Sequence, residues 1–241
     1  MNILAKRSLF VVYLILFHAF VVVVFLETDV VDRIQQRLGF EIIHDELTPH
    51  YHVMLNYHKS IDKHAQKGSV IFIGDSMIQG MSVSSVHPRA VNYGIGYDTS
   101  YGVIKRLPDY LSVSQAGLVV IAIGYNDLKR RNLNELVENY HEIIHLIPYH
   151  VPVLFSAILP VDEEASGNTG FNARILDINN QIFKMCESDN RLYILDVSYD
   201  LKDKDGGLSD KYHIGDGVHL NQSGYMLWIS KLKNAIELIL L

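Results

Sequence analysis

Val70-Ile71-Phe72-Ile73-Gly74-Asp75-Ser76 is an apolar, β-forming run that ends abruptly in a glycine, an acid and a hydroxyl. Such a run is typical of a buried strand in a parallel sheet that is covered on both faces. Ligands of these sheets bind beyond the carboxyl ends of the strands, so Ser76 lies where chemistry is expected. Because Gly-Asp-Ser is also common in turns, a catalytic interpretation needs a base and an orienting carboxylate elsewhere in the chain.

Both groups occur near the C-terminus in Asp216-Gly217-Val218-His219. A carboxylate three residues before an imidazole can hydrogen-bond to it on one helical turn or in a tight loop. A serine hydroxyl is a poor nucleophile until a base takes its proton. Ser76, His219 and Asp216 are therefore the candidate nucleophile, base and orienting acid.

Strand-like and helix-like segments alternate along the chain, which is typical of an α/β fold with a parallel sheet. Five segments are predicted strands: Val70–Ile73, Ala90–Tyr93, Leu118–Ile123, Val153–Ile158 and Leu192–Val197. Helical periodicity is found in Tyr51–Lys67, Ser100–Leu111, Leu133–Ile147, Asn172–Cys186 and Asn221–Leu240. The segment 200–217 has little pattern and is predicted to be a surface loop leading to Asp216.

Composition limits the class of protein. With 241 residues, of which 49% are hydrophobic, the chain is long enough for one substantial core plus an appendage. Its net charge of −6 argues against a nucleic-acid partner, which normally needs a basic face. Cys186 is the single cysteine, so the chain has neither an internal disulfide nor a thiolate cluster.

The N-terminus resembles a membrane anchor. Lys6 and Arg7 precede an uncharged run from Ser8 to Leu26, and acidic residues follow it. A run of this length nearly matches a hydrocarbon core of about 30 Å, and the charge asymmetry predicts a cytoplasmic N-terminus. We therefore expect a single-pass membrane protein with an extracytoplasmic catalytic domain, periplasmic if the source is Gram-negative; the alternative is a long secretory signal.

The predicted organisation has three parts. Residues 1–26 form a cytoplasmic stub and transmembrane anchor, 27–50 a juxtamembrane stalk with a short amphipathic helix, and 51–241 the catalytic domain. The segment 44–64 is rich in histidine but lacks a metal-binding pattern such as His-Glu-x-x-His, so we interpret its histidines as solvated and predict no metal.

Two further strand ends carry residues suited to a reaction centre. Asn92-Tyr93-Gly94-Ile95-Gly96-Tyr97-Asp98-Thr99 follows the second strand, and Gly124-Tyr125-Asn126-Asp127 follows the third. Acyl transfer needs donors aimed at a developing oxyanion, and backbone N–H groups or an Asn amide serve this purpose. A dinucleotide-binding glycine motif is disfavoured, because its third glycine and its distant acidic residue are missing.

These blocks, in this order, resemble those of the SGNH (GDSL-like) hydrolases over about Tyr51 to Leu238. Within that superfamily the chain is most similar to the branch of the platelet-activating-factor acetylhydrolase catalytic subunits, through 72–76, 92–96 and Leu159-Pro160. The resemblance implies a three-layer α/β/α, flavodoxin-like fold with a mostly five-stranded parallel sheet. It also implies that Ser76 is the nucleophile, His219 its base and Asp216 the orienting carboxylate, with no cofactor.

The resemblance further implies an oxyanion hole made by the Ser76 N–H, a backbone N–H of the second block and the Asn126 side chain. The family usually has glycine immediately before the Asp of the second block, whereas this chain has Tyr97 there and Gly96 one residue earlier. Either Gly96 or Tyr97 supplies the N–H, and the Tyr97 side chain is a candidate to narrow the acyl pocket. The α/β-hydrolase fold is disfavoured, because Ile78 occupies the last glycine position of Gly-x-Ser-x-Gly.

We therefore predict a membrane-anchored serine esterase that hydrolyses a short-chain acyl or acetyl ester through an acyl-enzyme on Ser76. An O-acetylated envelope glycan and a lysophospholipid are the leading substrates, because the tether raises local concentration at an envelope surface. The alternatives are an acyltransferase that uses the same acyl-enzyme and a non-catalytic binding module. The oligomeric state is left open.

Overall fold

The computed structural model describes residues 3–27 and 46–241. The chain divides into two compact units, Met1–Asp45 and Glu46–Leu241. The first contains helix α1, Ile3–Glu27. Within the described residues, no helix combines the length and apolarity that crossing a bilayer requires, so the transmembrane helix stays a prediction. The predicted amphipathic helix of the stalk lies outside the described residues.

The second unit is built on a five-stranded sheet with the order β2-β1-β3-β4-β5. Every strand pair is parallel, as predicted. The strands are β1 Val70–Gly74, β2 Ala90–Gly94, β3 Leu118–Ala122, β4 Val153–Ser156 and β5 Leu192–Leu195. This is the flavodoxin-like order, whose switch point falls between β1 and β3. Ser76 follows β1 and thus lies at that switch point.

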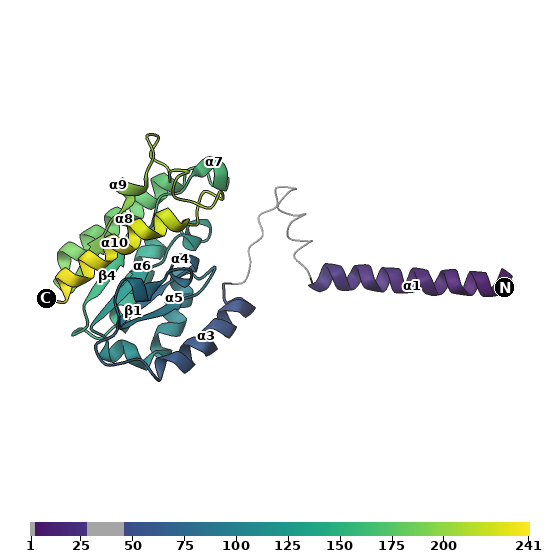
Figure 1. The fold of residues 1–241 in the computed structure, drawn as a ribbon, viewed down its shortest axis with the longest axis horizontal. Coiled ribbons are helices and arrows are strands. Elements are labelled where there is room, and N and C mark those ends of the chain that lie inside the picture. The colour runs from purple at the N-terminus through teal and green to yellow at the C-terminus, as the bar shows by residue number, and fades with distance from the viewer. Residues whose placement is uncertain (1–2, 28–45) are drawn as a thin grey trace. The chain divides into compact units, whose positions relative to one another are not determined.

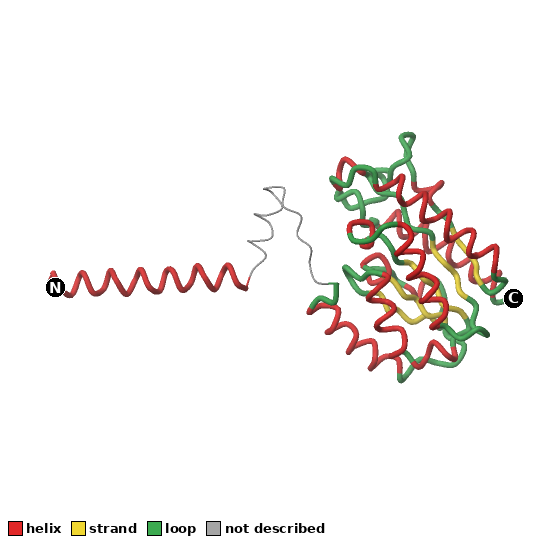
Figure 2. Tube along the Cα trace, turned by 180° about the vertical axis from the view of Figure 1, so that it is seen from behind, coloured by secondary structure: helices red, strands yellow, loops and turns green. Residues whose placement is uncertain are grey.

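Helices cover both faces of the sheet, which gives three layers (Figures 1 and 2). On one face α5 Ser100–Arg106, α6 Leu133–Leu146 and α8 Phe171–Ser188 pack on Ile71, Ile73, Val119 and Ile121. On the other, α4 Ser76–Gln79 and α10 Gln222–Ile239 pack on Val70, Phe72 and Val120. Alternate residues of each strand thus enter opposite cores, as the period of two requires. Two short helices, α7 Glu163–Ser166 and α9 Ser198–Leu201, lie in loops.

Several elements are shorter than predicted, for local reasons. β5 ends at Leu195, and the Asp196 side chain then accepts the Ser198 N–H at the start of α9. The helix predicted over Ser100–Leu111 ends at Arg106 and continues only as a 3₁₀ turn containing Pro108. Proline offers no N–H and clashes with the preceding turn, so a regular helix does not continue through it.

Helix α3, Pro49–Asp62, is anchored on the domain by buried polar contacts. It begins two residues before the predicted start, because the Thr48 side chain caps it and Pro49 suits the first turn. The prediction that its histidines are all solvated is wrong for His58, which is buried and hydrogen-bonds to the Tyr110 hydroxyl at 3.0 Å. Burial, with a smaller contribution from Arg106, lowers the pKa of His58 to about 3, so this ring is neutral.

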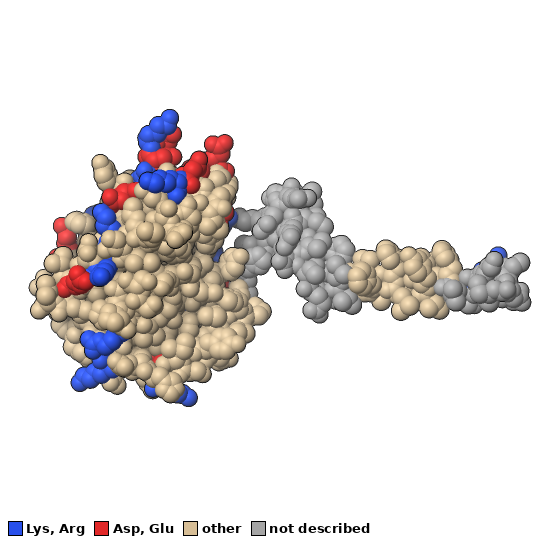
Figure 3. Space-filling view, viewed as in Figure 1, with Lys and Arg blue, Asp and Glu red and all other residues tan. Residues whose placement is uncertain are grey.

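Charged side chains on the visible face of the domain gather in the upper region, near α7 and α9 (Figure 3). There Lys and Arg are interspersed with Asp and Glu, while most of the face is uncharged. A broad basic patch, which a nucleic acid would need, is missing from this view of the described residues.

Candidate active site

Ser76 begins helix α4 directly after the central strand β1. Asp75 caps this helix, and its side chain accepts the Met77 N–H at 2.9 Å. Gly74 permits the tight turn, because a Cβ there would lie 2.3 Å from the Ala122 carbonyl oxygen and 2.5 Å from Ile78 Cγ1. The chain can therefore turn sharply and present the Ser76 hydroxyl above the end of the sheet.

The structure brings together Ser76, His219 and Asp216, although Ser76 and His219 are 143 positions apart in the sequence. Ser76 Oγ lies 2.9 Å from His219 Nε2, and His219 Nδ1 lies 2.7 Å from Asp216 Oδ2. Because the carboxylate requires a proton on Nδ1, the neutral ring keeps the lone pair of Nε2 free to accept the serine proton. This is the arrangement that general-base activation of a serine requires.

Hydrogen bonds keep Asp216 ionised. Its second oxygen, Oδ1, accepts the backbone N–H groups of Val218 and His219 at 3.0 and 2.9 Å. Partial burial by itself raises the pKa of this carboxyl, but these bonds and the His219 ring outweigh it, and the pKa lies below its usual value. The short loop thus holds the acid and the base in fixed geometry.

The sequence left open whether the Gly96 or the Tyr97 backbone N–H serves the oxyanion, and the structure distinguishes these two groups. The Gly96 N–H donates to Gln79 Oε1, whereas the Tyr97 N–H has no acceptor among the described residues. Tyr97 has φ +64°, in the left-handed region that favours glycine, which is the residue that the resemblance led us to expect at this position. Its side chain is 75% exposed, so it does not fill the interior of a pocket.

Asn126 lies on the same side as these donors, in the 3₁₀ turn that follows β3. Its Nδ2 donates to the Asp98 carbonyl oxygen at 2.9 Å, which fixes the amide beside the second block. An Asn amide carries two N–H bonds, so one remains for an oxyanion.

Sequence reasoning missed Arg106, whose side chain is fully buried beneath the site. Its guanidinium donates to Asp98 Oδ2 at 2.8 Å and to the carbonyl oxygens of Gly74 and Tyr93, at the ends of β1 and β2. Burial raises the pKa of Asp98 to about 6, although Arg106 opposes that shift. The available sequence signal for a buried role of Arg106 was the presence of a cationic residue among the apolar positions of a short helix.

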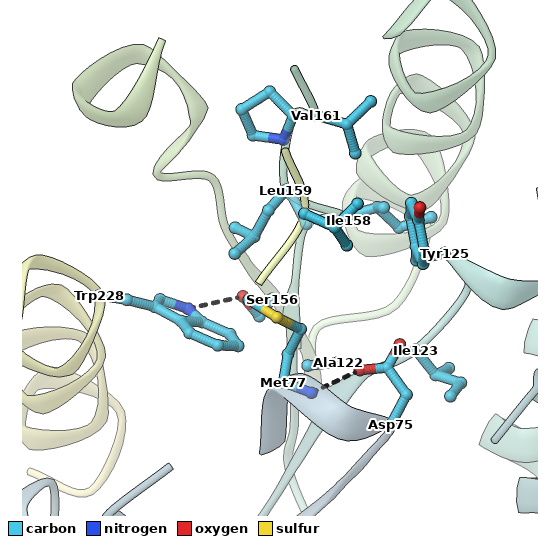
Figure 4. A pocket seen from close by; sticks show the side chains of 13 residues that line it. Asp75, Met77, Ala122, Ile123, Tyr125, Ser156, Ile158, Leu159, Val161 and Trp228 are labelled. Atoms are coloured by element: carbon cyan, nitrogen blue, oxygen red, sulfur yellow. Dashed lines mark hydrogen bonds between the residues drawn. The ribbon is translucent and has the colours of Figure 1, made fainter. Parts of the chain in front are cut away.

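A small, mostly apolar cavity of about 40 Å³ lies next to Asp75 and Met77, the residues on either side of Ser76 (Figure 4). Its wall includes the neighbours of the triad residues, namely Asp75, Met77 and Val218, together with Tyr125 and Trp228. The Trp228 indole is fixed by donating to Ser156 Oγ at 3.0 Å. Burial raises the pKa of Asp75 to about 7, so the carboxyl in this wall keeps its proton to a much higher pH than a free carboxyl does.

Asp162, Asp210 and His213 lie close enough together to suggest a metal site. However, His213 Nδ1 accepts the N–H groups of Gly215 and Gly217 at 3.0 and 3.1 Å, so the neutral ring carries its proton on Nε2. That proton points to Asp210 Oδ1 at 3.2 Å. A metal at Nε2 would have to displace the Nε2 proton, so these residues fit a hydrogen-bonded loop better than a metal centre.

The comparisons with known proteins agree with this geometry. The model of the GDSL-like lipase/acylhydrolase family matches residues 72–227, which is well over half of the chain. The chain therefore belongs to this family, the GDSL-like or SGNH hydrolases, and is a serine ester hydrolase. No match is found among curated proteins.

Solved structures with the same fold include three informative examples. A Streptococcus pneumoniae protein, provisionally described as a platelet activating factor, has TM-score 0.71 and 22% identity, covering 78% of this chain and 92% of its own. A GDSL-like lipase from Bacteroides thetaiotaomicron has TM-score 0.65 and 20% identity, covering 76% and 97%. An acetyl xylan esterase has TM-score 0.58 and 20% identity, covering 70% and 99%. At these identities the likeness concerns the fold.

Proposed function

We propose that this protein hydrolyses short-chain acyl esters through an acyl-enzyme on Ser76. The observation that carries the proposal is the continuous hydrogen-bonded chain from Ser76 Oγ through His219 to Asp216, with links of 2.9 and 2.7 Å. His219 takes the serine proton as Oγ attacks the ester carbonyl, and Asp216 stabilises the imidazolium that forms. His219 then gives the proton to the leaving alcohol, and water activated by the same ring releases the acid.

The oxyanion of the tetrahedral intermediate is assigned to the Ser76 N–H, the Tyr97 N–H and the Asn126 amide. Tyr97 is preferred to Gly96, because the Gly96 N–H is already used by Gln79. The Asn126 amide is fixed by the Asp98 carbonyl oxygen, and the Ser76 N–H by the start of α4. Preorganised donors of this kind are usually the largest electrostatic contribution to acyl transfer.

The small cavity next to Asp75 and Met77, the residues that flank Ser76, supports the proposal of a small acyl group. At about 40 Å³ it offers room on the order of one or two water molecules, which suits an acetyl methyl rather than a long chain. An O-acetylated glycan and a lysophospholipid remain the proposed substrate classes; an acetyl xylan esterase among the fold neighbours supports the glycan.

We also propose that the N-terminus anchors the enzyme to a membrane, with the catalytic domain outside the cytoplasm. Support comes from the uncharged run Ser8–Leu26 behind Lys6 and Arg7. Retention of the intact chain in carbonate-washed membranes, with the domain digestible by protease added outside, is the expected result. Release by carbonate would contradict the anchor.

The activity is tested with p-nitrophenyl acetate, butyrate and octanoate, using the chain with Ser76 and its Ser76→Ala variant. We expect serine-dependent turnover that is greatest for acetate. Equal turnover by Ser76→Ala would refute the mechanism, and preference for octanoate would refute the small acyl group. Turnover only after addition of a sugar or lipid hydroxyl would favour the acyltransferase alternative.

A further inference from the structure

Gln79 links three segments of the chain at one atom. It ends helix α4, three residues after Ser76. Its Oε1 accepts the Gly96 N–H of the second block and lies 3.1 Å from His50 Nε2 on α3. Because a residue three positions on lies on the same helix face, Gln79 connects the serine's own helix to the neighbouring loop.

The Gly96 contact determines which N–H group of the second block stays without an acceptor among the described residues. With the Gly96 N–H directed at Gln79, the next N–H along the chain is that of Tyr97, which has no acceptor among the described residues. Tyr97 adopts φ +64°, a left-handed conformation that is unfavourable for a residue with a Cβ. Such a conformation persists only where the surroundings hold it, and the Gln79 side chain is a direct hydrogen-bond partner of the preceding residue.

His50 fixes the orientation of that amide. Since the Gly96 N–H needs an acceptor, the carboxamide oxygen must face it, and the same oxygen then requires a donor from His50 Nε2. If the amide were flipped, its NH₂ group would face the N–H groups of Gly96 and His50, and neither of them would have an acceptor there. The His50 ring is exposed, so burial in the core does not account for its position.

The helix that carries His50 lies outside residues 72–227, the part that matches the family model. Nearby contacts attach this segment to the second block and to helix α5, which follows it. Glu46 accepts from Thr99 Oγ1 of the block at 2.6 Å, and the Tyr51 hydroxyl donates to the Gly102 carbonyl oxygen of α5 at 2.9 Å. Glu46 also pairs with Arg131, just after the Asn126 turn. The N-terminal segment thus contacts both loops that carry the proposed oxyanion donors.

We propose that His50 and Gln79 are positioning residues: His50 orients the Gln79 amide, which holds Gly96 so that the Tyr97 N–H is presented to the oxyanion. The inference rests on the proposed function of Ser76. It adds that a residue outside the part of the chain that matches the family model controls the geometry of the oxyanion hole.

The test uses the full chain and steady-state kinetics with p-nitrophenyl acetate. Gln79→Met keeps the side chain's length but removes the acceptor, and we expect kcat to fall about 10- to 100-fold with KM within about twofold, as loss of a transition-state interaction does. We expect His50→Ala to lower kcat about 3- to 10-fold. His50→Gln retains an N–H donor and is expected to recover most of that loss.

Two controls separate positioning from general damage. His52→Ala changes an exposed histidine on the same helix and should leave kcat unaltered. Because His50 acts through Gln79, the double variant should be no slower than Gln79→Met alone. A rise in KM at unchanged kcat in His50→Ala, additive losses in the double variant, or equal losses in His52→Ala would each overturn the proposal. Full turnover in Ser76→Ala would instead overturn the proposed function.

Discussion

The buried carboxyl of Asp75 should make the stability of the domain depend on pH. It is buried beside the cavity, with Oδ1 accepting the Met77 N–H. Burial raises its pKa to about 7 from an ordinary value of 3.8, although the Met77 N–H and His219 oppose the shift. Between these two values the folded chain holds a proton that the unfolded chain has released. The free energy of unfolding therefore falls as pH rises through this window.

The size of the effect follows from the two pKa values. From pH 5 upward the unfolded chain, with a pKa of 3.8, has released this proton, whereas the folded chain keeps it until the pH approaches about 7. Raising the pH from 5 to 8 therefore favours the unfolded chain and removes about 2–3 kcal/mol of stability. Asp75→Asn cannot ionise and keeps an oxygen to accept the Met77 N–H, so it should escape this loss. Urea unfolding at several pH values, compared with the original chain, measures the difference.

We expect the stability of Asp75→Asn relative to the original chain to increase by about 2–3 kcal/mol from pH 5 to pH 8. Asp205→Asn is the matched control, because Asp205 is an exposed carboxyl in a surface loop. It should leave the pH dependence unchanged. Parallel stability curves for Asp75→Asn and the original chain would refute the argument that this buried carboxyl retains its proton.

Three substitutions and one treatment test other parts of the site. Asn126→Ala should lower kcat about 10²- to 10³-fold, measured with p-nitrophenyl acetate. Arg106→Met leaves Asp98 buried without its cation and should destabilise the domain by about 3–5 kcal/mol in urea unfolding. Tyr125→Ser enlarges the cavity next to Asp75 and Met77 and should raise kcat/KM for butyrate relative to acetate. Because the proposed Ser76–His219–Asp216 chemistry needs no metal, incubation with EDTA should leave turnover unchanged.

The elements that the sequence predicted well are those whose signals are local. The strand before Ser76 is a continuous run of β-forming residues, and all four residues Val70 to Ile73 are completely buried, as such a run implies. The pairing of Asp216 with His219 depends only on a short loop. Their meeting with Ser76 was not a local signal; it was predicted because a serine nucleophile needs a base and because the chain resembles the SGNH hydrolases.

The choice between Gly96 and Tyr97 could not be made in this way. It depends on where the Gln79 amide oxygen points, and that orientation depends on His50, which is 29 residues away along the chain. Arg106 was missed for the same reason. A cation in a short helix is ordinary on a surface, and only the fold brings the carbonyl oxygens of Gly74 and Tyr93 around it.

His213 and His219 show most directly why residue type alone is insufficient. Both lie in one loop, and each uses both ring nitrogens, but in opposite senses. His219 donates from Nδ1 to Asp216 and accepts at Nε2, whereas His213 accepts two backbone N–H groups at Nδ1 and directs Nε2 toward Asp210. The partners around each ring select its tautomer, so one histidine is left with a lone pair for the serine proton and the other holds the shape of the loop. Two side chains of the same type therefore have different roles, a base at His219 and a structural hydrogen-bonding group at His213, because their hydrogen-bond partners differ.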